Sequence, residues 1–213
     1  MEAKAYIFDF DGVLVNSTSY IGKGVVEFLD SFHISYPEDV VKIIMPLGYE
    51  GMAKYFHDEL GLDREVNEIV EMMRQGIYYY YANEIGLKDG VIEYLHKLKE
   101  SGCSINVLTA SPHEIVDVCM NRLGITELFE HVWTCEDMGM KKSEPEIYEK
   151  AAHLLEKSVD EVAFFDDNII SLSTAKKAGM QTVGVYDVAG IEFEQEMKET
   201  GDRYIYSFRE LEE

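Results

Sequence analysis

The sequence predicts an α/β fold in which a parallel sheet carries an all-helical insertion after its first strand. Three observations lead to this prediction. A short apolar run near the start of the chain ends in two aspartates, residues 16–85 show only helical patterns, and strands alternate with helices from residue 86 onward. Such alternation is typical of right-handed βαβ units that share a parallel sheet. We therefore expect an α/β core domain from residues 1–15 and 86–213, and a helical domain from residues 16–85.

The first predicted strand covers residues 5–8 and leads directly into Asp9 and Asp11. Most of its residues are aromatic or β-branched, and a short apolar run of this kind favours a buried parallel strand. Ligands of open α/β sheets bind beyond the carboxyl ends of the strands, so the two aspartates lie where chemistry is expected. Gly12 allows a sharp turn there. Taken alone, the fragment also fits a strand that ends in a solvated Asp-Gly turn.

The insertion is expected to contain four helices, because its apolar residues recur at helical spacing. The first carries Ile21 to Phe32, the second begins at Pro37, the third spans Tyr49 to Leu60, and the fourth begins at Asp63. The turn Pro46-Leu47-Gly48 separates the second helix from the third. Since the insertion directly follows the first strand, we expect it to lie over the Asp9–Asp11 corner as a lid, with Gly48 as a candidate substrate contact.

The remainder of the chain supplies the other strands of the core. Strands are predicted at residues 103–108, 131–134, 162–165 and 182–185, with a last short strand near Tyr204. Helices are expected between them, several of them ended by a glycine just past the last turn. The sequence contains no internal repeat and no low-complexity segment.

The charge balance excludes several classes of partner. The chain has 19 basic and 41 acidic residues, which give a formal net charge of −22. A surface this negative disfavours nucleic acid and anionic membranes. It also repels anionic substrates, so any phosphate site needs its own positive charge or a metal ion. No apolar run is long enough to cross a membrane.

The cysteines point to a reducing compartment. There are three, at positions 103, 119 and 135, without the CxxC spacing of zinc sites. An odd number argues against a disulfide framework. The chain also enters its first strand at once, without the pattern of a signal peptide. We therefore expect a cytoplasmic protein.

Polar residues follow three predicted strands or open a helix in a pattern that suits a phosphate group and a divalent metal. Thr109 ends the strand at 103–108, and its hydroxyl and the following backbone N–H of Ala110 can donate to phosphate oxygens. Lys142 lies at the start of a predicted helix, where an ammonium can neutralise an anion. Asp166 and Asp167 end an apolar strand. Clustered carboxylates suit Mg²⁺, which also relieves their mutual repulsion.

These residues resemble the four motifs of the haloacid dehalogenase superfamily in order and spacing: Asp9-Phe10-Asp11-Gly12-Val13, then Thr109, then Lys142 with Pro145, then Asp166-Asp167. The chain looks most like the phosphoglycolate phosphatase and β-phosphoglucomutase branch. The resemblance covers nearly the whole chain. It implies a Rossmann-like core with strand order 5-4-1-2-3 and a small helical cap. It departs from the family at Asn16, where an acidic residue is common, and at Ser143, where proline is common.

The resemblance also implies roles for individual residues. Asp9 would be the nucleophile that forms an aspartyl-phosphate, and Asp11 would be the general acid and base. Mg²⁺ would be bound by Asp9, the backbone carbonyl of Asp11 and Asp167, with Asp166 bound directly or through water. Thr109 and Lys142 would hold the transferring phosphoryl group, as phosphoryl transfer requires positioning and charge neutralisation.

The resemblance leaves more than one reaction to weigh. Dehalogenases of the superfamily lack the second aspartate, which Asp11 supplies here. Mutases of the β-phosphoglucomutase type carry a histidine where this chain has Ile21. A phosphatase is therefore the expected enzyme, with a phosphomutase or a non-catalytic binding scaffold as alternatives. The expected substrate is a small phosphorylated metabolite such as a sugar phosphate, phosphoglycolate or a nucleoside monophosphate, and the expected state is a monomer or weak homodimer.

Overall fold

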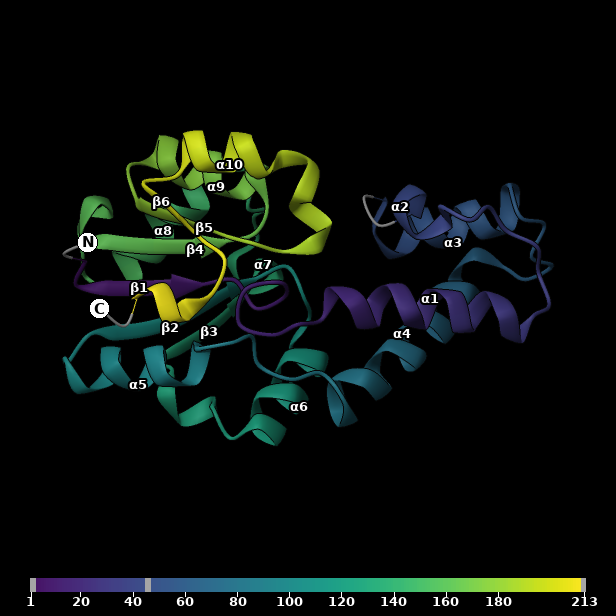
Figure 1. Cartoon of the computed structure of the whole chain (residues 1–213), viewed down its shortest axis with the longest axis horizontal. Coiled ribbons are helices and arrows are strands. Elements are labelled where there is room, and N and C mark those ends of the chain that lie inside the picture. Colours follow the sequence, from purple (N-terminus) through teal and green to yellow (C-terminus); the bar gives the residue numbers. More distant parts are fainter. Residues whose placement is uncertain (1–2, 45–46, 212–213) are drawn as a thin grey trace. The chain divides into compact units, whose positions relative to one another are not determined.

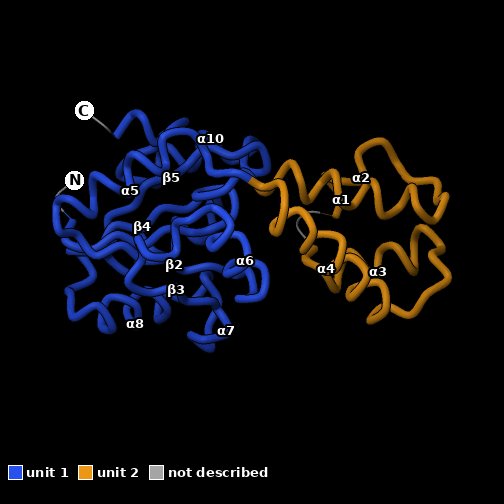
Figure 2. The backbone as a smooth tube through the Cα atoms, turned by 90° about the horizontal axis from the view of Figure 1, so that it is seen from below, with its two compact units in different colours: residues 1–16, 86–213 blue, residues 17–85 orange. Residues whose placement is uncertain are grey.

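The structure, a computed structural model, describes residues 3–44 and 47–211. The chain divides into two compact units, shown in Figure 2. The first is formed by residues 1–16 and 86–213, and the second by residues 17–85. The division into two domains that the sequence indicates, residues 1–15 with 86–213 and residues 16–85, stays a prediction. Met45 and Pro46, which the sequence places at the second helix and the following turn, lie outside the described residues.

The first unit is built on a six-stranded parallel sheet with the order β3-β2-β1-β4-β5-β6. The strands are β1 (Ala5–Phe8), β2 (Ser104–Thr109), β3 (His131–Thr134), β4 (Val162–Asp166), β5 (Gln181–Val185) and β6 (Arg203–Ile205). The α/β core is thus confirmed, and the first five strands follow the expected order. The observed order differs from the predicted one by β6, which pairs with β5 through three residues at the edge of the sheet.

Helices cover both faces of this sheet. The α-helices of the first unit are α5 (Val91–Glu100), α6 (His113–Leu123), α7 (Cys135–Met138), α8 (Glu146–Leu154), α9 (Ile169–Ala178) and α10 (Glu194–Thr200). Short 3₁₀ helices are η2 (Thr126–Leu128), η3 (Val159–Glu161), η4 (Val188–Phe193) and η5 (Phe208–Leu211). In Figure 1, α5 and α6 lie on one side of the sheet, and α8, α9 and α10 lie on the other.

The side chains of β1 alternate between the two faces of the sheet. Ala5 and Ile7 belong to a buried cluster with residues of α8, whereas Tyr6 and Phe8 contact Tyr94 of α5 on the opposite side. Successive side chains of a strand point to opposite faces of the sheet, so a strand buried on both faces is apolar at every position. The sequence of β1 has this pattern. The central strand β1 therefore packs against helices on both faces of the sheet. This central position places the end of β1 between the ends of β2 and β4.

The second unit contains only helices among its described residues. They are α1 (Thr18–Ser31), α2 (Val40–Ile44), α3 (Gly48–Asp58) and α4 (Val66–Asn83). Their apolar faces share one buried cluster with members from all four helices, among them Leu29, Ile44, Phe56 and Ile69. The helical pattern predicted for this segment is thus observed. Nowhere in residues 3–44 and 47–211 is there a helix with the length and apolar composition needed to cross a membrane.

Candidate active site

Asp9 and Asp11 lie at the carboxyl end of β1, at the centre of the sheet. The backbone N–H of Asp9 donates to the carbonyl of Phe165 in β4 at 2.9 Å, which extends the strand pairing by one residue. Asp9 is buried, and Asp11 is partly exposed. The hydroxyl of Ser111 donates to Asp11 Oδ2 at 2.5 Å. The turn therefore presents one enclosed carboxylate and one that is more accessible.

Gly12 is required by the way this turn packs. Its φ is +69°, a backbone conformation that side chains disfavour. A Cβ at this position would lie 2.3 Å from Oδ2 of Asp167. The absence of a side chain thus lets the Asp167 carboxylate approach the turn. Residues 9–12 and 166–167 form one continuous group for this reason.

Lys142 supplies the positive charge that the sequence analysis required. Its ammonium lies 2.6 Å from Asp9 Oδ1 and 2.9 Å from Asp166 Oδ2. The side chain is almost fully buried, so these ion pairs are weakly screened by solvent. The hydroxyl of Tyr148, in α8, lies 2.8 Å from the Lys142 carbonyl and 3.0 Å from the Ser171 carbonyl. Having a single proton, it donates to one of them at a time and so joins α8 either to the Lys142 segment or to α9.

Burial and charge shift the pKa values in this cluster. Burial raises the pKa of Asp9 to about 7, although the Lys142 ammonium opposes the shift. Burial also raises the pKa of Asp167, and the carboxylates of Asp166 and Asp9 add to this. Burial alone would lower the pKa of Lys142, but its two carboxylate partners outweigh that effect and raise it. The lysine therefore stays charged, while the carboxylates repel one another and favour a further cation.

The donor set fits a magnesium ion. Asp9, Asp166 and Asp167 each offer a carboxylate oxygen, and these oxygens lie within 4.8 Å of one another. All are hard oxygen donors, the type that Mg²⁺ prefers. Asp166 is also engaged elsewhere, since Oδ2 accepts from Lys142 and Oδ1 accepts from the backbone N–H of Asn168 at 2.8 Å. Asp9 and Asp167 are consequently the better placed of the three for direct ligation.

Thr109 and Ala110 follow on the other side of β1. Thr109 is the last residue of β2 and is buried, whereas Ala110 is exposed. The backbone N–H of Ser111 donates to Thr109 Oγ1 at 3.0 Å, which leaves the threonine hydroxyl proton available for another acceptor. Because β2 and β4 both neighbour β1, the threonine and the Asp166–Asp167 pair flank Asp9 from opposite sides.

Gly48 is not among the residues that the first unit brings together. It is the first residue of α3 in the second unit, with φ +65°. Its role as a substrate contact stays a prediction. Ser111, Tyr148 and Asn168, in contrast, support the site but are absent from the sequence-based candidates. Ser111 and Asn168 carried a signal, since Ser111 lies two residues past Thr109 and Asn168 directly follows Asp167. Tyr148 carried none, and its partner Ser171 lies 23 residues away.

The comparison with protein families decides the identity of this arrangement. The sequence pattern of the haloacid dehalogenase-like hydrolase family matches residues 6–185. The chain belongs to this family. The matched residues include the turn after β1, Lys142 and the end of β4, so the resemblance expected from the motifs is confirmed. The protein is accordingly an enzyme of a hydrolase family.

Curated members of the family resemble the chain over most of its length. Pyrophosphatase PpaX from Bacillus thuringiensis (strain Al Hakam) is 27% identical over 190 residues, which are 87% of this chain and 84% of that protein. Pyrophosphatase PpaX from Bacillus cereus (strain ATCC 10987 / NRS 248) matches to the same extent.

Solved structures share the fold. CbbY from Rhodobacter sphaeroides in complex with phosphate has a TM-score of 0.81 and 20% identity, and the match covers 99% of this chain and 96% of that one. A putative beta-phosphoglucomutase from Thermotoga maritima has a TM-score of 0.81 and 20% identity, with 95% and 94% of the chains covered. At these identities, the similarity supports the fold of this family member and leaves its substrate open.

Proposed function

We propose that this family member is a Mg²⁺-dependent phosphatase that hydrolyses a small-molecule phosphate monoester through an aspartyl-phosphate on Asp9. The observation that carries this proposal is the buried Lys142 ammonium within 3 Å of both Asp9 and Asp166, beside a third carboxylate. A phosphate group entering this corner meets a nucleophile, a fixed cation and a place for a metal ion. These are the parts that phosphoryl transfer needs.

In the first half-reaction, a carboxylate oxygen of Asp9 attacks phosphorus and the ester P–O bond breaks. Asp11 gives its proton to the departing oxygen, so that an alcohol leaves. The Ser111 hydroxyl on Asp11 Oδ2 orients that carboxyl group for the transfer. In the second half-reaction, Asp11 takes a proton from water as the water oxygen attacks phosphorus. The bond between phosphorus and Asp9 then breaks, which releases inorganic phosphate and restores the carboxylate.

Side-chain and backbone groups of this protein would neutralise or solvate the negative charges of the nucleophile and the phosphoryl group. Lys142 offsets the charge of Asp9 and favours its ionised form for attack, and the Thr109 hydroxyl and Ala110 N–H are donors for the phosphoryl oxygens. When bound, Mg²⁺ would neutralise the phosphoryl charge; Asp9, the Asp11 carbonyl and Asp167 would hold it. The strongly acidic composition of the chain makes such local cations necessary.

The substrate class rests on the curated relatives and on one residue of the second unit. The relatives are named pyrophosphatases, so pyrophosphate belongs among the compounds to test beside sugar phosphates, phosphoglycolate and nucleoside monophosphates. Ile21 in α1 stands where the related mutases carry a histidine, which disfavours the mutase alternative. We further propose a cytoplasmic enzyme that is a monomer or weak homodimer; its three cysteines are free thiols, as that compartment favours.

The test is phosphate release from this panel, with Mg²⁺ and with EDTA. We expect Mg²⁺-dependent hydrolysis of at least one compound. Asp9→Asn is expected to lower kcat by about 10³-fold or more while the circular dichroism spectrum stays unchanged, because the nucleophile is lost. The matched control is Asp160→Asn, an exposed carboxylate near the opposite end of β4, which should retain activity. Hydrolysis that is unchanged in Asp9→Asn would refute the assignment of the nucleophile.

A further inference from the structure

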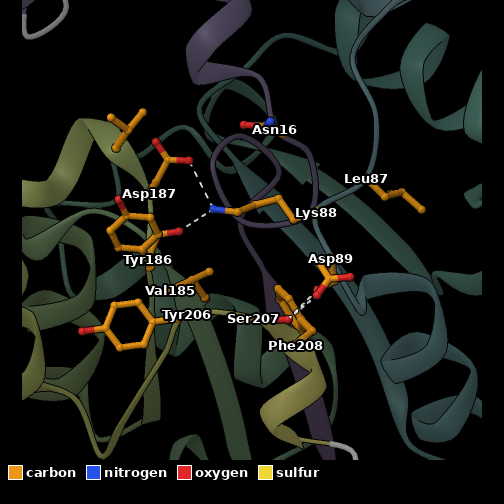
Figure 3. Close-up of a pocket in the computed structure, with 11 residues that line it drawn as sticks. Asn16, Leu87, Lys88, Asp89, Val185, Tyr186, Asp187, Tyr206, Ser207 and Phe208 are labelled. Carbon is orange, nitrogen blue, oxygen red and sulfur yellow. Dashed lines mark hydrogen bonds and ion pairs between the residues drawn. The ribbon is translucent and has the colours of Figure 1, made fainter.

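Lys88 is a partly buried cation that the reaction scheme above does not use. It lies where the chain has just returned to the first unit, and its side chain is 15% exposed. The ammonium donates to the carbonyl of Gly12 at 2.6 Å and to the carbonyl of Tyr186. It also forms an ion pair with Asp187 Oδ2 at 3.2 Å. Figure 3 shows the side chain extended toward Tyr186 and Asp187.

The main chain of Lys88 holds the same turn that its side chain reaches. The backbone N–H of Lys88 donates to the carbonyl of Leu14 at 3.0 Å. Within the turn, the N–H of Gly12 donates to the carbonyl of Val15 at 3.0 Å. Lys88 therefore fixes the segment after Asp11 at two points, with one hydrogen bond from its backbone and one from its ammonium.

The partners of Lys88 at the end of β5 also border the metal-binding group. Asp187 is buried, and its Oδ1 accepts from the backbone N–H of Ala189 at 3.1 Å, which starts η4. A Cβ on Gly190 would lie 2.9 Å from the carbonyl oxygen of Asp167, so the segment after Asp187 packs against the Asp167 backbone. Lys88 thus joins the backbone beside Asp11 to the segment beside Asp167.

The cavity next to Lys88 offers little to a charged ligand. It has a volume of about 290 Å³ and is the pocket drawn in Figure 3. Its charged lining groups are paired: Lys88 with Asp187, and Asp89 with Arg209 and the Ser207 hydroxyl. The contacts of Lys88 consequently favour a role in holding the turn after β1, and they do not favour a second binding site.

We propose that Lys88 is a positioning residue for the phosphatase reaction, which holds the Gly12 carbonyl and thereby sets the backbone of the Asp9–Gly12 turn. This inference rests on the proposed function. The Asp11 carbonyl expected to bind Mg²⁺ precedes Gly12 by one peptide unit, so a shift of the Gly12 carbonyl moves that ligand as well. Residues that orient metal ligands from behind typically change metal affinity or activity by about 10- to 100-fold when they are replaced.

The decisive variant replaces both members of the ion pair. Lys88→Met alone removes the donor to Gly12, but it also leaves the buried Asp187 carboxylate without its counter-ion, which destabilises the fold for an unrelated reason. Lys88→Met with Asp187→Asn removes one positive and one negative charge together, so the net charge of −22 does not change. Asp187→Asn alone is the matched control. In this variant Lys88 still donates hydrogen bonds to the Gly12 and Tyr186 carbonyls, and the asparagine side-chain oxygen can still accept from the Ala189 N–H.

Two measurements read out the proposal: Mg²⁺ affinity by isothermal titration calorimetry of the EDTA-treated proteins, and kcat and KM for the best substrate. We expect the double variant to bind Mg²⁺ about 10-fold more weakly and to lose about 10-fold or more in kcat, with KM changed less than about 3-fold. Asp187→Asn should stay within about 3-fold of the wild type in both. Thermal melting confirms that each variant is folded.

Wild-type Mg²⁺ affinity and kcat in the folded double variant would overturn the proposal, as would equal losses in Asp187→Asn alone. The calorimetric readout needs no substrate. If the wild type hydrolyses no compound, the phosphatase proposal fails, yet the Mg²⁺ titration still decides whether Lys88 positions the turn.

Discussion

The two aspartates of the first turn have different partners, and this difference supports the roles proposed for them. Asp9 is buried and pairs with the Lys142 ammonium, which favours the ionised form that the proposed nucleophile needs. Asp11 is more exposed and accepts from the Ser111 hydroxyl, a partner that tolerates both protonation states. A single residue between them, the buried Phe10, separates the two environments. In the proposed mechanism, the turn therefore combines a nucleophile held by Lys142 with a more accessible carboxyl group that exchanges a proton.

This division of roles predicts the behaviour of Asp11→Asn. An asparagine cannot give a proton to the departing oxygen or take one from water, so turnover of an alkyl phosphate should fall by about 10²- to 10⁴-fold. With p-nitrophenyl phosphate, whose leaving group needs little protonation, Asp9 should still be phosphorylated. We expect a rapid burst of p-nitrophenol equal to one per chain, followed by slow turnover, in stopped-flow absorbance.

The exposed Asp117→Asn in α6 is the control and should show wild-type kinetics. Wild-type steady-state turnover in Asp11→Asn, without a burst, would show that another group transfers the proton.

At the level of secondary structure, the start of α9 connects helix stability to the site. Asn168 caps this helix: its Oδ1 accepts from the backbone N–H of Ile170 at 2.9 Å and from that of Ser171 at 3.3 Å. Its own N–H donates to Asp166 Oδ1. The same residue thus follows Asp166 at the end of β4 and Asp167, and it begins the helix α9.

Asn168→Ala should therefore destabilise the protein. Loss of an N-cap side chain typically lowers the free energy of unfolding by about 1 kcal/mol. Urea denaturation followed by circular dichroism measures this change. Asn67→Ala, an exposed position within α4, is the comparison and should leave the free energy of unfolding nearly constant. An equal effect of the two substitutions would mean that the cap does not stabilise α9.

Much of the secondary structure around the site is predictable from the sequence. The strands β1, β2 and β4 are apolar runs that end in Asp9, Thr109 and Asp166, and parallel strands bring their carboxyl ends to one edge. The place of β6 in the sheet is harder to predict, because three residues with an arginine and a tyrosine among them carry no strand periodicity. The sequence does predict a short strand near Tyr204, but it does not predict the short helix α7 directly after β3.

Two supporting residues, Lys88 and Tyr148, could not be predicted because each contacts a partner that is far away in the chain. Lys88 reaches Gly12 and Tyr186 across 76 and 98 residues. Tyr148 lies 23 residues before Ser171. Neither residue type marks such a role by itself: a lysine between a leucine and an aspartate reads as a surface charge, and a tyrosine in an amphipathic helix reads as core. Contacts of this kind follow from the packing of the whole sheet.

For the whole molecule, the dominant property is negative charge, and part of it is buried at the site. In the metal-free protein the pKa of Asp9 is about 7, above its ordinary value of 3.8. The folded state therefore binds this proton more tightly than the unfolded state. The resulting stability is fully present below pH 4 and is lost as the pH rises to about 7. Mg²⁺ bound as proposed would reverse the preference, because it would favour the ionised carboxylate.

The melting temperature of the EDTA-treated protein should accordingly fall between pH 5 and pH 7.5, and it should fall more steeply in the wild type than in Asp9→Asn. Differential scanning fluorimetry with and without Mg²⁺ measures both slopes, and the difference between the two proteins should shrink when Mg²⁺ saturates. Parallel slopes in the metal-free proteins would contradict the raised pKa of Asp9.

The central claim is that Asp9 carries the phosphoryl group. Reaction with substrate and Mg²⁺, followed by rapid quenching and borohydride reduction, converts an aspartyl-phosphate into homoserine, which mass spectrometry of the peptides locates in the sequence. The account predicts homoserine at position 9, in amounts that increase in Asp11→Asn and vanish when substrate is left out. Homoserine at another position, or its absence from Asp11→Asn during a measured burst, would contradict the account.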